Sequence, residues 1–357
     1  GILQNGEASS LIFDMHSEYG WQGTSEGGQA VKGLKQLFGE QVAIFSLDAD
    51  STRRRGISPD VEVTIGYGEI EPEDIQTLAE TLNLTQLSTE AAYKLARRYG
   101  QGQWLSKFLA IQSREELGAL TEELGENDST ISALHRRLER LRRFPFLMPT
   151  APDDAVKRIL EYLDNGTHVV LEFGRYGNDL AAYILVANLL TRRIHQRYVQ
   201  RTEQAMGDQS QEPKPLVITI EEAHRFLTPG VASQTIFGTI AREMRKYKVA
   251  LLVVDQRPSG IDEEVLSQLG TRITYLLDNE RDVEAALSGT SGARELRKVL
   301  SRLDSKQQAL MFGHALPMPV VVRTREYGTE QSYREFGFRN PEDVRKQAEQ
   351  DAKDLFG

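Results

Sequence analysis

The sequence of 357 residues is long enough for one large or two ordinary domains, and its 39% hydrophobic residues describe a globular chain with a sizeable core. It has no cysteine, which excludes disulfides and thiolate chemistry, and it has neither a signal-peptide pattern nor an apolar run near the roughly 20 residues that span a bilayer, so we expect a cytoplasmic protein without a membrane partner. The net charge of −9 argues against non-specific coating of nucleic acid, although a cleft or ring can be basic locally.

Short apolar runs predict buried strands along the chain. The first residues, GILQNG, predict the last turn of a helix closed by Gly6, and a strand ending at Asp14 follows at once. Further runs predict strands at 42–46, 61–65, 168–173, 216–220, 249–254, 272–277, 308–313 and 319–324. Patterns of helical period lie between them, as at 180–198 and 234–247, so we expect βαβ units and an α/β fold with a mainly parallel sheet flanked by helices.

One block interrupts this alternation, because residues 71–143 have helical patterns throughout and no strand candidate. We interpret it as an all-helical subdomain inserted between strands. The polar segment 200–215 predicts an exposed loop, and the charged tail predicts an amphipathic helix or frayed end. The predicted division is the first part of the core at 1–66, the helical subdomain at 67–150, the second part of the core at 151–325 and a tail at 326–357.

The first strand ends in the sequence DMHSEY, where Asp14 and Glu18 are four residues apart. A turn there brings both carboxylates to one side of a metal–phosphate site. The structural alternative is a strand-end aspartate that only caps the next turn, and this short motif alone does not separate the two.

A second apolar run ends in ITIEEAHRF, which places Glu221 and Glu222 directly after a buried strand. Carboxylates at the C-terminal edge of a parallel sheet are typical of nucleotide sites, where one acid faces magnesium and the next faces an attacking water. A solvated acidic pair that opens a helix is the alternative. We favour the functional interpretation because a strand followed by E-E-A-H is a more specific string.

Three further side chains fit the same chemistry. Gln256 follows the strand at 249–254, so its amide is expected at the same sheet edge as Glu222, within reach of a γ-phosphate or a water. Arg242 and Arg245 are three positions apart on the preceding helix and therefore share one face. Arginines so placed can offer forked donors to phosphate oxygens in a transition state.

Taken in order, FDMHSEY, ITIEEAHRFL, IAREMRKYKVALLVVDQRPS and LMFGHALPMPVVVRT resemble the HerA-type ATPases, which are DNA-translocating motors of the FtsK–HerA branch of P-loop proteins. The resemblance covers about residues 1–325. It implies a RecA-like core with an inserted helical bundle, ATP and Mg²⁺ as cofactors, and assembly as a homo-hexamer around double-stranded DNA. It also implies pairing with a NurA-type nuclease in DNA end resection.

The resemblance assigns roles to individual residues. Glu222 matches the catalytic base, and Glu221 matches the magnesium-side acid, where the usual residue is the shorter Asp. Asp14 and Glu18 match the acidic nucleotide-binding motif, with Ser17 in place of a common glycine. Gln256 matches the sensor. Arg242 and Arg245 match arginines that act on the nucleotide of the same or of a neighbouring subunit, and the sequence does not decide between these two.

The phosphate-binding string G-x-x-x-x-G-K-[ST] does not occur in these 357 residues. In the HerA-type ATPases this loop and its helix immediately precede the first acidic motif, so GILQNG resembles the end of that helix. We therefore expect the chain to be the C-terminal part of a longer ATPase; a short form is the alternative.

Three functional hypotheses remain at this point. The first is an ATP-driven DNA translocase or helicase, and the second is a hydrolysis-deficient ring that holds DNA or a nuclease passively. The third is a related conjugation-type coupling ATPase. For DNA contact, residues 227–233 after the Glu222 motif are the candidate pore loop, whereas HRRLERLRR at 135–143, with five arginines, is more typical of a solvated helix face.

Overall fold

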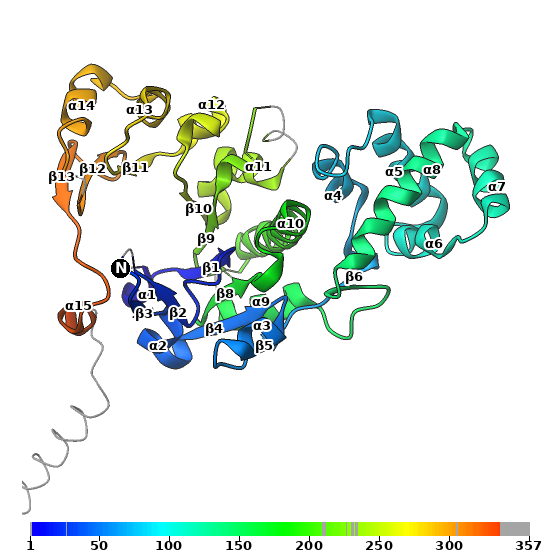
Figure 1. Ribbon diagram of the computed structural model, residues 1–357, viewed down its shortest axis with the longest axis horizontal. Coiled ribbons are helices and arrows are strands. Elements are labelled where there is room, and N and C mark those ends of the chain that lie inside the picture. The colour runs from blue at the N-terminus through cyan, green and yellow to red at the C-terminus, as the bar shows by residue number, and fades with distance from the viewer. Residues whose placement is uncertain are drawn as a thin grey trace, which may run out of the picture.

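The computed structural model describes residues 2–25, 27–208, 212–225, 227–229, 232, 235–304 and 306–335. Its centre is a six-stranded sheet in the order β10-β9-β1-β8-β4-β5, in which all neighbouring strands are parallel (Figure 1). The strands are β1 (Ser9–Asp14), β4 (Val42–Ser46), β5 (Val61–Glu62), β8 (His168–Glu172), β9 (Leu216–Glu221) and β10 (Val249–Val254). The predicted parallel α/β architecture is confirmed.

Both faces of this sheet are covered, which explains why its central strands β1 and β8 are buried at every position rather than alternately. Alternate residues such as Leu11, Phe13 and Phe45 join the large core with α9 (Ala155–Asp164) and α10 (Leu180–Ala205). On the opposite face, Ile12, Val42 and Val170 pack with side chains of α1 (Ile2–Asn5) and α2 (Leu34–Phe38). α1 and the positive φ of Gly6, 66°, confirm the predicted helix end.

The strand order reverses direction beside β1. From β1 the chain builds β4, β5 and β8 on one side, and it then crosses to build β9 and β10 on the other side. In open α/β sheets, the crevice at the carboxyl ends of the strands where the order reverses is the usual ligand site. Here that crevice lies between the ends of β1 and β9, at Asp14 and Glu221.

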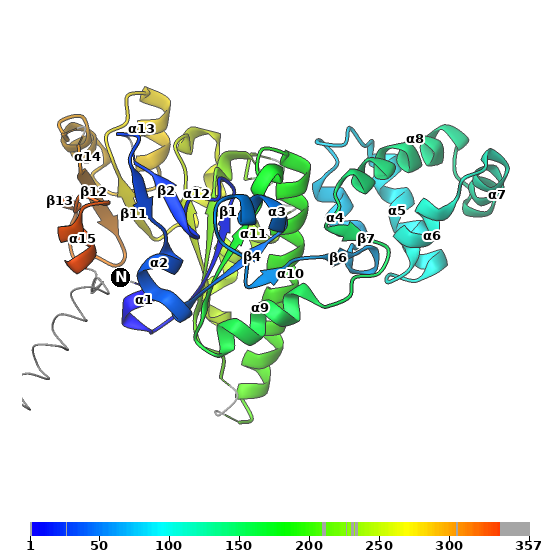
Figure 2. The same cartoon turned by 60° about the horizontal axis from the view of Figure 1, so that its bottom comes forward.

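The block predicted to be helical is helical, and both views place it to one side of the sheet (Figures 1 and 2). It contains α4 (Pro72–Thr77), α5 (Gln86–Tyr99), α6 (Trp104–Ala110), α7 (Arg114–Leu124), α8 (Asp128–Leu138) and η3 (Glu139–Arg143). The fully buried Asp74 of α4 accepts hydrogen bonds from Arg192 (2.8 and 3.3 Å) and from Asn188 (3.3 Å) of α10. This paired carboxylate ties the block to the core, and the exact limits of the subdomain stay a prediction.

The later strands form a separate antiparallel sheet, in the order β11-β12-β13. These strands are β11 (Thr271–Thr274), β12 (Gln308–Gly313) and β13 (Val320–Arg323), and β12 shares a small core with α13 (Glu280–Leu287) and α14 (Ala293–Leu300). Two predicted strands are shorter than expected. The run at 272–277 is strand only to Thr274, and the run at 61–65 divides between β5 and β6 (Ile65–Gly66), which pairs with β7 (Leu147–Met148).

The end of the described chain returns to the beginning. α15 (Glu330–Glu335) lies beside the hairpin of β2 (Gln22–Thr24) and β3 (Ala30–Lys32), where the backbone N–H of Lys32 donates to the Tyr333 hydroxyl at 2.8 Å. The predicted tail helix beyond residue 335 lies outside the described residues. Within the described residues, no helix combines the length and the apolar character needed to cross a membrane.

Candidate active site at the carboxyl edge of the sheet

Three neighbouring strands end in carboxylates that form one row across the edge of the sheet. Asp14 of β1 is the register partner of Glu172 of β8, and Glu221 of β9 is the register partner of Val254 of β10. The pairing of β1 with β9 matches Ile12 to Thr219, so continuing it by two residues brings Asp14 opposite Glu221. The sequence predicted two of these acids at one edge, and the structure adds Glu172 between β1 and β4.

Asp14 is completely buried and organises the turn that follows it. Its carboxylate accepts backbone N–H groups from Glu18 (3.0 Å), Tyr19 (2.8 Å) and Gly20 (3.2 Å). The pKa of Asp14 is raised to about 7, chiefly by burial; the backbone donors of Glu18 and Tyr19 lower it, and the nearby Glu172 and Glu221 add to the increase. The capping role left open by the sequence is therefore present, whereas Glu18 is exposed; the nucleotide-binding role of both residues stays a prediction.

Glu221 is half-buried beside that turn. Burial raises its pKa, and the Tyr19 hydroxyl, which donates a hydrogen bond to its carboxylate, lowers it in part. Its backbone carbonyl accepts the Tyr183 hydroxyl of α10 at 3.1 Å. Within the described part of the chain, Glu221 Oε2 is buried and has no hydrogen-bond partner. A buried oxygen in that state has a strong requirement for a ligand or water.

Glu222 has a left-handed backbone, with φ of 50°, which is uncommon for a residue other than glycine. Its N–H donates to the carbonyl of Val254 at 3.1 Å, so the turn after β9 is tied to the end of β10. Its carboxylate lies 3.7 Å from His224 Nε2 and 3.8 Å from Arg225 Nε. The conformation turns Glu222 away from the direction of β9, and its side chain remains partly accessible.

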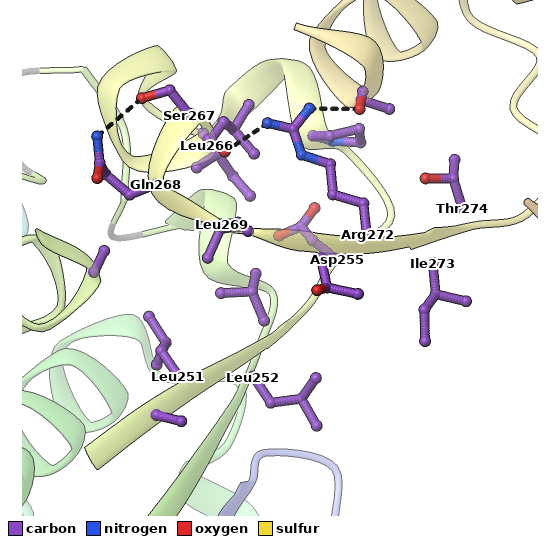
Figure 3. A pocket seen from close by; sticks show the side chains of 18 of the residues that line it. Leu251, Leu252, Asp255, Leu266, Ser267, Gln268, Leu269, Arg272, Ile273 and Thr274 are labelled. Atoms are coloured by element: carbon purple, nitrogen blue, oxygen red, sulfur yellow. Dashed lines mark hydrogen bonds between the residues drawn. The ribbon is translucent and has the colours of Figure 1, made fainter. Parts of the chain in front are cut away.

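The end of β10 contributes a residue that the sequence interpretation passed over. Asp255 binds both the backbone N–H and the ring of His224. Gln256, predicted at the same sheet edge as Glu222, is exposed, and both residues line a cavity of about 1550 Å³. Figure 3 shows this cavity between Leu251 and Leu252 of β10 and Arg272 and Ile273 of β11. The sensor role of Gln256 remains a prediction.

A second polar network braces the turn after β1 from the side of β4 and β8. The fully buried Glu172 accepts both terminal nitrogens of Arg55 and the hydroxyl of Thr52 at 3.0 Å. Arg55 Nη1 also donates to the carbonyl of Ser17, 3.1 Å away. Glu172 ends an apolar run as Asp14 does, so the same sequence signal could have identified it; no local pattern indicates Arg55.

For several residues of the predicted site, the described part of the structure gives no side-chain position to compare with the prediction. The backbones of Arg242 and Arg245 lie in α11 (Ile236–Glu243) and η8 (Met244–Tyr247), but their side chains lie outside the described residues. The candidate pore loop 227–233 is described only at 227–229 and 232. In the arginine-rich helix, Arg137 and Arg142 donate to backbone carbonyls and Arg143 pairs with Asp179, which favours a structural role for these three.

The acidic row is compatible with magnesium bound through a nucleotide, but not with a metal held by protein alone. Among the described residues, no group of three or more His, Cys, Asp or Glu side chains could hold a metal ion. Mg²⁺ is usually bound by one or two carboxylates together with substrate phosphates and waters, and the buried Glu221 Oε2 supplies a suitable oxygen. These 357 residues contain no recognisable loop that would donate hydrogen bonds to the phosphates.

Comparison with known proteins decides the family. The family described as "Helicase HerA, central domain" matches residues 1–194, more than half of the chain. The chain belongs to the HerA helicase family. The DNA double-strand break repair helicase HerA of Sulfolobus acidocaldarius is 27% identical over 216 residues, or 60% of this chain and 42% of that protein. HerA of Pyrococcus furiosus is 38% identical over 112 residues, or 30% of this chain and 20% of that protein.

A solved structure confirms the architecture. The bacterial conjugative coupling protein TrwB matches with a TM-score of 0.56, covering 93% of this chain and 82% of that chain at 9% identity. At this identity the likeness shows the fold alone, and it confirms the RecA-like core predicted for a HerA-type protein. The matches to the curated HerA relatives above span less than half of the length of those proteins. The activity of a complete HerA helicase is therefore a proposal for this chain.

Proposed function

We propose that this chain is the motor portion of an ATP-driven, HerA-type translocase or helicase that acts on double-stranded DNA. The observation that carries the proposal is the acidic row at the reversal point of the sheet, with Glu221 at the end of β9 and Glu222 directly after it, in a chain of the HerA family. The curated relatives are named as DNA double-strand break repair helicases. We further propose that a homo-hexamer encircles the DNA and acts with a NurA-type nuclease in end resection.

The proposed chemistry divides between the two glutamates. Magnesium, when bound with ATP, neutralises charge on the phosphates, and Glu221 with its buried Oε2 is the acid that faces it. Asp14 holds the turn bearing Glu18 through its three backbone hydrogen bonds. Glu222, whose carboxylate is partly accessible, orients the attacking water and accepts its proton. Gln256, Arg242 and Arg245 would contact the γ-phosphate or the water.

The decisive experiment changes Glu222→Gln in the protein expressed from its complete reading frame. The amide keeps the shape of the side chain but cannot accept a proton, so kcat for ATP should fall by about 10²–10⁴-fold while nucleotide binding is retained. The matched control is Glu263→Gln, at an exposed position in the first turn of α12 (Glu263–Gln268), and it should hydrolyse ATP normally. Normal turnover by Glu222→Gln would exclude Glu222 as the base.

A second candidate function is a ring-forming scaffold that binds DNA or a nuclease without hydrolysis. The absence of G-K-S and G-K-T from the 357 residues would favour it only if the protein had no phosphate-binding loop elsewhere. The ATP-driven motor is favoured by the presence of the predicted catalytic side chains, because a passive ring has no chemical need for them. These side chains are Glu221, Glu222, Gln256, Arg242 and Arg245. An unchanged ATP concentration after incubation of the complete protein with DNA and Mg²⁺ would select the scaffold.

A further inference from the structure

The strongest unassigned feature near the proposed site is the carboxylate of Asp255, directly after β10. Its side chain is only 5% exposed. It accepts the backbone N–H of His224 at 2.8 Å, the ring Nδ1 of His224 at 3.0 Å and the backbone N–H of Arg257 at 2.6 Å. A buried carboxylate that receives three donors is strongly held, and two of these donors belong to one residue of the Glu222 turn.

These hydrogen bonds act on a backbone that is held in an unfavourable conformation. A non-glycine residue with a left-handed φ is energetically unfavourable and persists only where the surroundings impose it. Glu222, at φ of 50°, has its own N–H bound to the Val254 carbonyl, and His224, two residues later, has its N–H bound to Asp255. The end of β10 therefore holds the turn on both sides of Glu222.

The same contacts position the imidazole of His224 between two carboxylates. Nδ1 faces Asp255, so Nε2 is directed to the other side, where Glu222 Oε2 lies 3.7 Å away. Gly260 restricts the histidine further, since a Cβ at that position would lie 3.0 Å from His224 Cβ. The imidazole ring thus lies beside the Glu222 carboxylate, and its hydrogen bond to Asp255 fixes the position of the ring.

We propose that Asp255 is a positioning residue that sets the direction of the Glu222 carboxylate, through the backbone and ring of His224. The inference rests on the proposed role of Glu222 as the base. The sequence predicted Gln256, which follows β10, at the same sheet edge as Glu222 and within reach of a γ-phosphate or a water. Asp255 is the residue after β10 whose carboxylate contacts the Glu222 turn, and both Asp255 and Gln256 lie along the cavity beside β11.

The test compares Asp255→Asn with a matched control in the protein expressed from its complete reading frame. Asparagine keeps the size of the side chain but replaces one acceptor oxygen by an NH₂ group, so it cannot receive all three donors. Asp262→Asn makes the same change at an aspartate whose carboxylate also accepts two backbone N–H groups, but from Glu264 and Val265 rather than from His224. Asp255→Asn should lower kcat by about 10–10²-fold with KM for ATP within about twofold, and Asp262→Asn should not.

A second measurement does not need hydrolysis. In the 357-residue chain, amide hydrogen exchange at Glu222 and His224 should accelerate in Asp255→Asn by at least about tenfold, with no change at these amides in Asp262→Asn. If the wild type does not hydrolyse ATP, the proposed function fails, and the exchange result alone decides the inference. Exchange at Glu222 and His224 equal to that of the wild type, or a kcat equal to that of Asp262→Asn, would overturn the role of Asp255.

Discussion

Arg55 and Glu172 are 117 positions apart in the chain, yet they form an ion pair that braces the turn after β1. Glu172 is fully buried, and Arg55 Nη1 lies 3.2 Å from its Oε1. The same nitrogen donates to the carbonyl of Ser17, whose φ of 57° is left-handed. Gly20 lies directly against Glu172, since a Cβ there would approach Oε1 to 2.3 Å. The pair therefore holds the turn that presents Glu18.

Removal of Arg55 should destabilise the fold strongly. Arg55→Ala leaves Glu172 charged and buried without its partner, and breaking such a pair costs about 3–5 kcal/mol. Because the Arg55 side chain is 29% exposed, we expect the lower end, about 3 kcal/mol, in urea denaturation. Arg54→Ala, at the neighbouring exposed arginine, is the control and should change stability by less than about 0.5 kcal/mol. Equal stability of the two variants would contradict the bracing role.

Asp14 should make the stability depend on pH in a defined direction. Its pKa is raised to about 7 in the folded chain from an ordinary value of 3.8, chiefly by burial. Between about pH 4 and pH 7 the folded chain therefore retains a proton that the unfolded chain has released. The contribution of Asp14 to stability consequently falls as the pH rises, by up to about 1.4 kcal/mol per pH unit.

The measurement is urea denaturation of the wild type and of Asp14→Asn at several pH values from 4 to 8. Subtracting one stability curve from the other removes the groups that both proteins share, including Glu221, whose pKa is also raised. The wild type should lose stability relative to Asp14→Asn as the pH increases. A difference that is constant with pH, or one that increases in favour of the wild type, would show that Asp14 is ionised throughout.

The 357-residue chain by itself should bind ATP weakly. It contains no G-K-S or G-K-T, so the β- and γ-phosphates lack a glycine-rich set of backbone donors and the accompanying lysine. Calorimetric titration with Mg²⁺-ATP should show a Kd well above the micromolar range. Micromolar affinity in this chain would mean that other residues bind the phosphates.

The arginines of the helix before β10 should act across subunits. A finger supplied by a neighbour contributes about 10³–10⁵ in rate, so Arg242→Ala or Arg245→Ala should silence hydrolysis while the oligomer remains intact. The informative experiment mixes such a subunit with Glu222→Gln, each inactive alone. For a finger in trans, some interfaces combine an intact Glu222 with an intact arginine, and partial ATPase activity should return. No recovery from either mixture, with subunit exchange verified, would indicate action within one subunit.

The sequence by itself determined the position of the acids. A short apolar run that ends in Asp14 or in Glu221 is typical of a buried strand whose last residues reach the edge of a sheet, and both residues are found there. The helical block from Pro72 to Arg143 was equally evident, because its apolar residues repeat with helical period and no run in it is suited to a buried strand. Local periodicity carries this information, so these elements can be predicted without knowing which segments pack against them.

Tertiary structure alone decided which neighbouring residue serves the site. Asp255 and Gln256 are adjacent in sequence and both line the cavity beside β11, but it is the carboxylate of Asp255 that binds His224. No local pattern states that choice. The contact between Arg55 and Glu172 likewise exists only because parallel pairing of β4 with β8 brings the segments after them together, across 117 positions of sequence. Long-range strand pairing sets these geometries, and nothing in the local sequence around either residue indicates its partner.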